Sequence, residues 1–474
     1  MACHLYVTSD FGSLPGRGIV TACLGELGFW DELSDRPQTN KAPHWASVGR
    51  RASVLASAFT MATLVYGYSA IACASEEATA EYKQWSDRLA AAAKHHDAAD
   101  ELLCVTTIGR RWTWALNTLP HRLIEQAVSE SEPARLGRSR IELLQMLYEL
   151  RWLHSDGSEP SRWWLQLSLD LLEHNRQQEA FAVAAHITDP YALVGLQADN
   201  RYKRIAKSEF VERDILKATR KELEQRQAAA RQRPRDLSRV VQVARGFMLL
   251  HRYDEVLKLT DPVLQGKQAA TPESSPYEDL QREFPWILNV RARALSALGR
   301  YDETVALLRR ACQESSEDLV SHSLNLASFL AALNRPQEAL AAIPPLEHAS
   351  VYGHAVAAWV RVVVASELDD AAGLEAALDD LRAHAQDYPG TRESALIIAG
   401  REDEAAATLV ARLSDPDLRT DALVELQDYA DNPGPARAIG WRERQKAVRS
   451  RPEIRQAVGA YGRIRAYAVP GVGL

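Results

Sequence analysis

The sequence predicts an all-α chain of antiparallel helical hairpins, because helical periodicity, helix-start signals and a recurring motif all indicate helices. From residue 75 onward, apolar residues recur at helical spacing, as at Tyr82, Trp85 and Leu89. No alternating run is long enough to form a sheet, and the β-branched run at 360–365 lies inside a helical pattern. Aspartates that precede prolines predict further helix starts, and these are Asp189, Asp261 and Asp415.

A short turn motif recurs along the chain. It reads Gly, Asn or His, then Arg, two variable residues and Glu, and it joins two stretches with helical apolar spacing. The clearest copies are ALSALGRYDETVALLRRA at 294–311, FMLLHRYDEVLKLTDPVL at 247–264 and FLAALNRPQEALAAIPPL at 329–346. Related stretches occupy 171–187 and 397–413, and we expect the same turn in NRYKRIAKS at 200–208. Repetition at this scale is typical of stacked helical hairpins.

The turn LGRYDETV resembles the consensus turn of the tetratricopeptide repeat family. The resemblance implies an α-solenoid with a right-handed superhelix, in which each hairpin buries its apolar face against the next. It also implies pairs of small residues where the two helices of a hairpin cross: Ala292 with Thr304, Ala327 with Ala339, and Ser168 with Ala180. The step from Thr304 to Ala339 is 35 residues, whereas an insertion lengthens the step from Val256 to Thr304 to 48. We therefore expect an irregular array.

Residues 52–74 carry no charge over 23 positions and follow Arg50 and Arg51. The arginine pair, the apolar stretch and the A-x-A sequence at 72–74 occur in the order of a secretory signal. The length also suits a membrane anchor, Cys73 permits a lipoprotein signal, and a soluble core helix is the third interpretation. We favour a cleaved signal, which predicts a periplasmic or secreted protein, with anchoring by 50–74 as the alternative.

The 47 residues before this segment show no sustained helical or strand period. If the source is bacterial, a GUG start at Val48 would give a signal of 27 residues, and the leader before it would not belong to the native protein. Removal of the signal leaves Cys104 and Cys312. These two could form a disulfide in an oxidising compartment or be buried as small apolar residues.

The charge and the missing motifs narrow the function classes. A net charge of −7 argues against nucleic acid as a partner, because phosphate binding needs a basic surplus. The sequence lacks the GxSxG, GxxxxGK[ST], HExxH and GxGxxG motifs. We therefore expect a protein that is not an enzyme, with no catalytic residue, no cofactor and no metal site.

Three clusters could nevertheless carry chemistry. His95, His96, Asp97 and Asp100 form the best metal candidate, but two ligands on one helix face do not make a site, so we expect surface residues. The tryptophans between 112 and 164 could line a cleft, although such side chains more often fill gaps between helices. They are Trp112, Trp114, Trp152, Trp163 and Trp164.

The third cluster is the basic run at 201–239, which has 13 Lys and Arg against 6 Asp and Glu. It could dock an acidic partner or an anionic envelope surface. The interpretation we favour is a long solvated helix with i,i+4 ion pairs: Glu209 with Arg213, and Glu222 with Arg226.

In the tetratricopeptide family, the first helix of each repeat faces a binding groove. The resemblance places Arg245 of one hairpin and Trp286, Asn289 and Arg293 of the next at groove positions, where they could bind an extended peptide or an acidic group. The alternative is that all four are ordinary exposed residues. The lysine and asparagine pattern that clamps a C-terminal carboxylate in some members is missing.

These observations predict an exported, non-catalytic protein-binding scaffold that uses the concave face of the array. Its partner would be a protein or peptide of unknown identity and not nucleic acid, with membrane contact only through 50–74 if that segment stays uncleaved. One alternative is an envelope enzyme or enzyme accessory that uses the tryptophan-rich region at 75–160. The other is a cytosolic regulatory protein of the same repeat family.

The predicted organisation has seven parts. They are a poorly structured leader (1–47), a signal or anchor (48–74), an N-terminal helical region (75–160), divergent repeat-like helices (161–264), clear repeats (283–347), degenerate repeat-like helices (350–430), and C-terminal helices with a tail (431–474).

Overall fold

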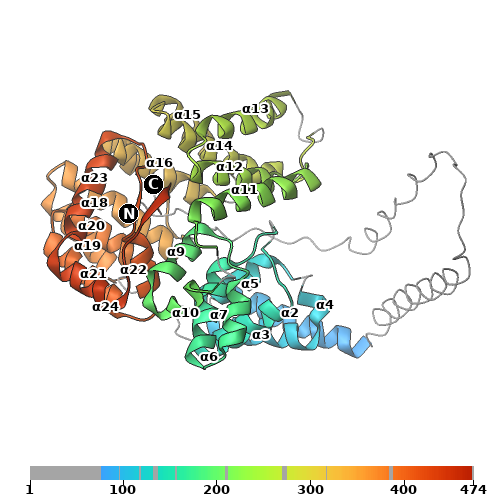
Figure 1. Ribbon diagram of the computed structural model, residues 1–474. Coiled ribbons are helices and arrows are strands. Elements are labelled where there is room, and N and C mark those ends of the chain that lie inside the picture. The colour runs from blue at the N-terminus through green and yellow to red at the C-terminus, as the bar shows by residue number, and fades with distance from the viewer. Residues whose placement is uncertain are drawn as a thin grey trace, which may run out of the picture.

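The computed structural model describes residues 76–471 except for short internal gaps, and the described residues are mostly helical (Figure 1). The gaps are 96, 117–118, 132–136, 155–156, 209–211, 270–274, 316–317, 348 and 384–387. The predicted leader and the uncharged segment at 50–74 lie outside the described residues. The all-α prediction is confirmed for the part that is described, and residues 360–365 are helical.

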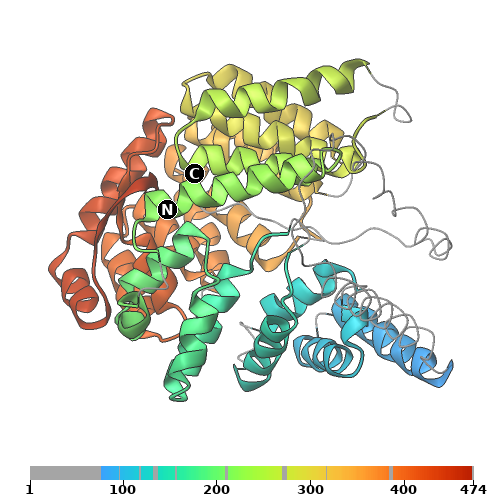
Figure 2. The same cartoon turned by 45° about the vertical axis from the view of Figure 1, so that its right-hand side comes forward.

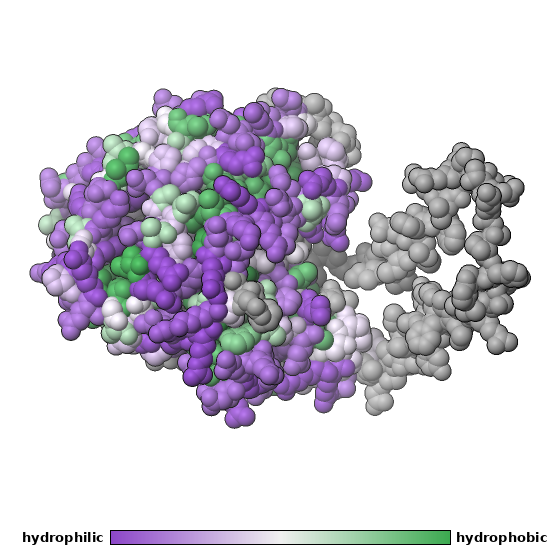
Figure 3. Space-filling view, in the orientation of Figure 1, coloured by the Kyte–Doolittle hydropathy of each residue, from purple (hydrophilic) through white to green (hydrophobic). Residues whose placement is uncertain are grey.

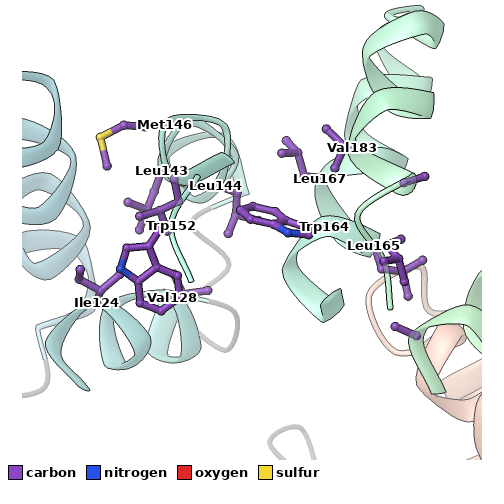
Figure 4. Close-up of a cluster of buried hydrophobic side chains, with 14 of the residues drawn as sticks. Ile124, Val128, Leu143, Leu144, Met146, Trp152, Trp164, Leu165, Leu167 and Val183 are labelled. Atoms are coloured by element: carbon purple, nitrogen blue, oxygen red, sulfur yellow. The ribbon is translucent and has the colours of Figure 1, made fainter. Parts of the chain in front are cut away.

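Five helices precede the hairpins: α2 (Glu76–His95), α3 (Ala98–Arg111), α4 (Thr113–Leu116), α5 (His121–Ser131) and α6 (Gly137–Glu149). Helix α3 lies at their centre and contacts the other four. Their apolar sides share one core with the next helices of the chain, and the buried Trp152 and Trp164 fill much of it (Figure 4). Figure 2 shows this group beside the stacked helices that follow.

Six antiparallel hairpins follow within the described residues. They are α7 (Ser161–Glu173) with α8 (Gln177–Ala184), α12 (Leu237–Leu249) with α13 (Tyr253–Ala269), α14 (Leu280–Ala297) with α15 (Tyr301–Glu314), α16 (Leu319–Ala332) with α17 (Pro336–Ala341), α18 (Val351–Glu367) with α19 (Ala371–Ala383), and α20 (Pro389–Ile398) with α21 (Glu402–Ser414). Between the first and second hairpins lie α9 (Pro190–Ala198), the 3₁₀ turn η1 (Asn200–Tyr202), α10 (Lys203–Ala206) and α11 (Ile215–Gln232).

From α12 onward, neighbouring hairpins pack in chain order. Each second helix contacts the first helix of the next hairpin, and first helices contact one another at α12–α14, α16–α18 and α18–α20. The outer surface is largely hydrophilic with scattered apolar patches, as Figure 3 shows for one face.

The turn motif closes five of these hairpins with the same geometry. At the end of α14, Gly299 has φ +76°, and the Arg300 amide donates to the Leu295 carbonyl at 2.9 Å, which satisfies the last turn of the helix. The Arg300 guanidinium then donates to Glu303 in the first turn of α15, at 2.6 Å. The same ion pair recurs as Arg176–Glu179, Arg252–Glu255, Arg335–Glu338 and Arg401–Glu404. The motif therefore combines a left-handed helix end with an ion pair at the next helix start.

The small-residue pairs lie where the resemblance implies. The Thr304 hydroxyl donates to the Ala292 carbonyl at 3.2 Å, which confirms the close crossing of α14 and α15. The other two pairs are buried in helices that contact each other: Ala327 with Ala339, and Ser168 with Ala180.

The C-terminal part contains α22 (Arg419–Glu425), β1 (Asp428–Ala430), α23 (Ala436–Arg449), α24 (Pro452–Tyr461) and β2 (Ala466–Pro470). The two strands pair in parallel, with Tyr429 opposite Tyr467. The sequence did not predict this small sheet, because strands of three and five residues are too short to show an alternating pattern.

This C-terminal part returns to α7, α9 and α11, as the red and green segments in Figure 1 show. Arg162 of α7 pairs with Asp421 of α22 at 2.7 Å. The Tyr191 hydroxyl donates to the carbonyl of Pro470 at 2.9 Å, and the Arg463 side chain donates to the Gln197 carbonyl at 2.7 Å. Helices that are far apart in the sequence are thus held together by direct contacts.

Three local expectations have different outcomes. Asp189 caps α9 and accepts from the Ala192 amide at 2.8 Å, as predicted. Asp261 does not start a helix, because α13 continues through Pro262 and Asp261 instead pairs with Arg291 at 2.7 Å. Asp415 precedes a turn, and α22 begins only at Arg419.

The stretch at 200–208 also differs from expectation. Arg201 pairs with Asp199 rather than with a residue three positions later, and residues 200–202 form a 3₁₀ turn.

Among the described helices, none combines the length and apolarity that crossing a bilayer requires.

Candidate functional site

The four groove residues lie on neighbouring first helices. Arg245 is on α12, and Trp286, Asn289 and Arg293 occupy one face of α14 at helical spacing. Arg293 is exposed, Arg245 and Trp286 are half-buried, and Asn289 is only 5% exposed. Arg245 and Arg293 are therefore accessible to solvent, whereas Trp286 and Asn289 contact the neighbouring hairpin.

Asn289 is held in a buried network. Its amide nitrogen donates to the Pro285 carbonyl at 3.2 Å and to Nδ1 of His322. Its carbonyl oxygen accepts from Asn325 of α16 at 3.1 Å. These bonds fix α14 against α16, so Asn289 supports the face rather than presenting a free amide to a ligand.

His322 lies at the centre of this network and is fully buried. Burial lowers its pKa to about 4, because the charged imidazolium would be desolvated. The neutral ring accepts from Asn289 at Nδ1, which places the proton on Nε2. That Nε2 is buried and has no hydrogen-bond partner in the described part of the chain.

Trp286 covers the histidine and contacts the start of α16. Its ring centroid lies 4.5 Å from that of His322. Its indole nitrogen donates to the Asp318 carboxylate at 2.8 Å. The indole edge is thereby anchored at the start of α16, and the ring remains half-buried.

Arg245 lies close enough to Glu283 of α14 to affect its ionisation. Burial raises the pKa of Glu283, and the positive charges of Arg282 and Arg245 partly offset that rise. Arg282 donates to Glu283 at 2.9 Å. The negative charge of Asp279 adds to the rise, so the contact between α12 and α14 holds charges of both signs.

The sequence analysis did not select the α16 residues of this network. Asp318, His322 and Asn325 recur at i, i+4 and i+7, which places them on one helix side. They belong to the first helix of the hairpin that turns at Asn334. The rule that selected positions on α14 would have missed them, because the equivalent positions 35 residues later are Ser321, Leu324 and Ser328.

The corresponding sides of α16, α18 and α20 are covered by α23. Trp441 of α23 packs edge-on against Trp359 of α18, with ring centroids 5.5 Å apart. Arg437 pairs with Glu367 at the end of α18, and the Arg444 side chain donates to the Ile398 carbonyl at 3.4 Å. In this half of the array, a helix of the same chain therefore packs over the first helices.

The tryptophan-rich region serves mainly as core. Trp112, Trp152 and Trp164 are buried, and the rings of Trp152 and Trp163 stack at 5.1 Å. Trp114 is the exception, at 52% exposure. The core interpretation holds for three of these five side chains, and Trp163 is half-buried against them.

The other candidate clusters have local structural partners. Asp97 accepts from the Asp100 amide at 3.1 Å and caps α3, while Asp100 pairs with Arg88. No group of three or more potential metal ligands occurs among the residues that the structure describes, and His96 lies outside them.

Cys104 and Cys312 are not bonded to each other, and burial raises the pKa of the Cys104 thiol to about 11. In the basic run, Glu222 pairs with Arg226 at 2.6 Å as expected. The other expected pair involves Glu209, which lies outside the described residues.

No family model matches the chain, and no curated protein shows significant similarity to it.

Proposed function

We propose that the protein is a non-catalytic, protein-binding scaffold whose hairpins form a tetratricopeptide-like solenoid. The proposed binding face consists of Arg245, Trp286 and Arg293, and its partner is an extended segment rich in Asp or Glu. The observation that carries the proposal is the exposed cation Arg293 on the same helix face as the half-buried indole of Trp286, two turns away, on a helix that is bonded to Asp318 and His322.

Two physical arguments support an acidic, extended partner. Arginine forms paired hydrogen bonds with carboxylates, and the Trp286 ring offers apolar contact at little cost in conformational entropy. The network of Asn289, His322 and Asn325 fixes the backbone of α14 and α16, and preorganisation of this kind lowers the cost of binding.

Export is a separate proposal. It rests on the order of Arg50, Arg51, the uncharged stretch and the A-x-A sequence. N-terminal sequencing of the native protein tests it: a mature chain that begins near Ser75 agrees, and one that begins at Met1 contradicts it.

The binding face is tested by selecting 12-residue peptides from a random display library on the full chain. We expect enrichment of Asp and Glu, and binding of a selected peptide measured by fluorescence anisotropy. Arg293→Glu should weaken that binding by about tenfold or more, since close charge pairs are often worth over ~1.4 kcal/mol.

Arg138→Glu is the matched control, because the Arg138 side chain is 95% exposed and lies on α6, outside the proposed face. Circular dichroism should show unchanged folding for both variants. The proposal fails if the selected peptides lack acidic residues, or if Arg293→Glu binds as tightly as the control.

A further inference from the structure

A pocket of about 480 Å³ lies between α7 and the segment η1–α10, away from the proposed binding face. Its lining consists of Leu169, Leu172, Glu173, Asn200, Arg201, Lys203, Arg204 and Lys207. We propose that this pocket binds an amphiphilic phosphate, with the phosphate at the three cations Lys203, Arg204 and Lys207 and an apolar chain against the two leucines. The proposal does not rest on the proposed function.

The chain presents these cations from a rigidly anchored turn. Tyr202 and Ile205 are almost fully buried in the same core as α7, whereas Lys203, Arg204 and Lys207 are exposed. Buried and exposed positions therefore alternate within one short turn. The backbone at the pocket is held by its apolar residues and leaves the cations at the rim.

Arg201 forms the back of the pocket and is already neutralised. Its guanidinium donates to the fully buried Asp199 at 2.8 Å and to the Thr420 hydroxyl at 3.1 Å. Thr420 in turn donates to Asp199 at 2.8 Å. This network connects the pocket wall to α22 and fixes the position of Arg201.

The three other cations that line the pocket have few acidic residues near them. Lys203, Arg204 and Lys207 form no ion pair with any acidic residue of the described chain, and Glu173 is the one carboxylate in the lining. Elsewhere in the protein, the turn arginines pair with a glutamate three residues later. The cations at 203–207 differ from these turn arginines because the described residues supply no acidic partner for them.

The two leucines of the pocket further restrict the class of ligand. Leu169 and Leu172 are half-buried side chains of α7 that line the same pocket as the cations. An inorganic ion would leave them in contact with water, whereas an alkyl chain would cover them. A phosphate head carries more than one negative charge near neutral pH and so matches several cations better than a carboxylate does.

The experiment uses the full chain and three probes. In isothermal titration calorimetry, hexyl phosphate should bind at least tenfold more tightly than inorganic phosphate. Flotation with vesicles that contain phosphatidic acid then distinguishes the source: vesicle binding identifies a lipid head group, and hexyl phosphate binding without vesicle binding identifies a soluble ligand.

The double variant Lys203→Glu with Lys207→Glu should lower hexyl phosphate affinity at least tenfold. Lys221→Glu, at an exposed position of α11, is the control and should bind like the wild type. Leu172→Ser should weaken hexyl phosphate and leave inorganic phosphate unchanged. The proposal is overturned if hexyl phosphate does not bind, if the double variant binds normally, or if Lys221→Glu weakens binding equally.

Discussion

The first helices of the hairpins differ in exposure between the two halves of the array. On α12 and α14, Arg293 is exposed, and Arg245 and Trp286 are half-buried. On α18, the comparable side is covered by Trp441 of α23. The same repeated hairpin thus supports an accessible polar face in one half and an internal interface in the other. The difference lies in what the rest of the chain places over the face, not in how each hairpin is built.

The largest loss of stability is expected where α23 covers α18. Trp441→Ala removes a side chain that is 5% exposed and leaves a cavity against Trp359. We expect a loss of about 3–5 kcal/mol in the free energy of unfolding, measured by urea denaturation. Trp286→Ala on the accessible face should cost roughly half as much or less, since that ring is half-buried. Equal losses would contradict the distinction between the two faces.

The second effect concerns pH. His322 has a pKa of about 4 in the folded chain and about 6.5 when unfolded. Between these values the unfolded chain binds a proton that the folded chain does not, so stability falls as the pH drops through this window. The expected loss is on the order of 3 kcal/mol by linkage. Urea titrations at pH 7 and pH 4 should show a smaller decrease for His322→Gln than for the wild type.

Substitution of two glycines should change stability by smaller amounts and in opposite directions. Gly299 has φ +76° at the turn after α14, so Gly299→Ala should destabilise the chain by about 1 kcal/mol. Gly440 is exposed inside α23, where an added Cβ would meet no atom within 4 Å. Gly440→Ala should stabilise the covering helix by up to about 1 kcal/mol. Thermal unfolding of both variants measures the opposite signs.

The smallest effect is expected at the Arg–Glu pairs of the turns. Arg300 and Glu303 are about half exposed, so Arg300→Ala should lower the unfolding temperature less than any of the other variants. A decrease as large as that of Gly299→Ala would show that the pair contributes more to the hairpin than its exposure suggests. Thermal unfolding at low and high salt measures both the size and the screening of the effect.

The sequence was sufficient for features that a few neighbouring residues determine. Gly299, Arg300 and Glu303 lie within one turn, so their pattern predicts the helix end and the next helix start. It was insufficient where a contact joins distant segments. Arg162 and Asp421 are 259 positions apart, and neither residue has a local pattern that indicates the other.

The candidate site shows the same limit. Helical spacing placed Trp286, Asn289 and Arg293 on one face of α14, but spacing does not reveal that Asn289 is buried against His322, which is 33 positions away. The phosphate pocket was likewise visible only as part of a basic run. Its two leucines come from α7, and packing alone brings them to α10.

The return of the C-terminal part to α7 and α9 has a consequence for unfolding. In an open row of repeats, the terminal unit has one neighbour and frays first. Here α22 is held by Arg162, and β2 is held by Tyr191. The last hairpins therefore have neighbours on both sides, so the row should melt as a cooperative unit, with amide exchange near its C-terminal end as slow as at its centre.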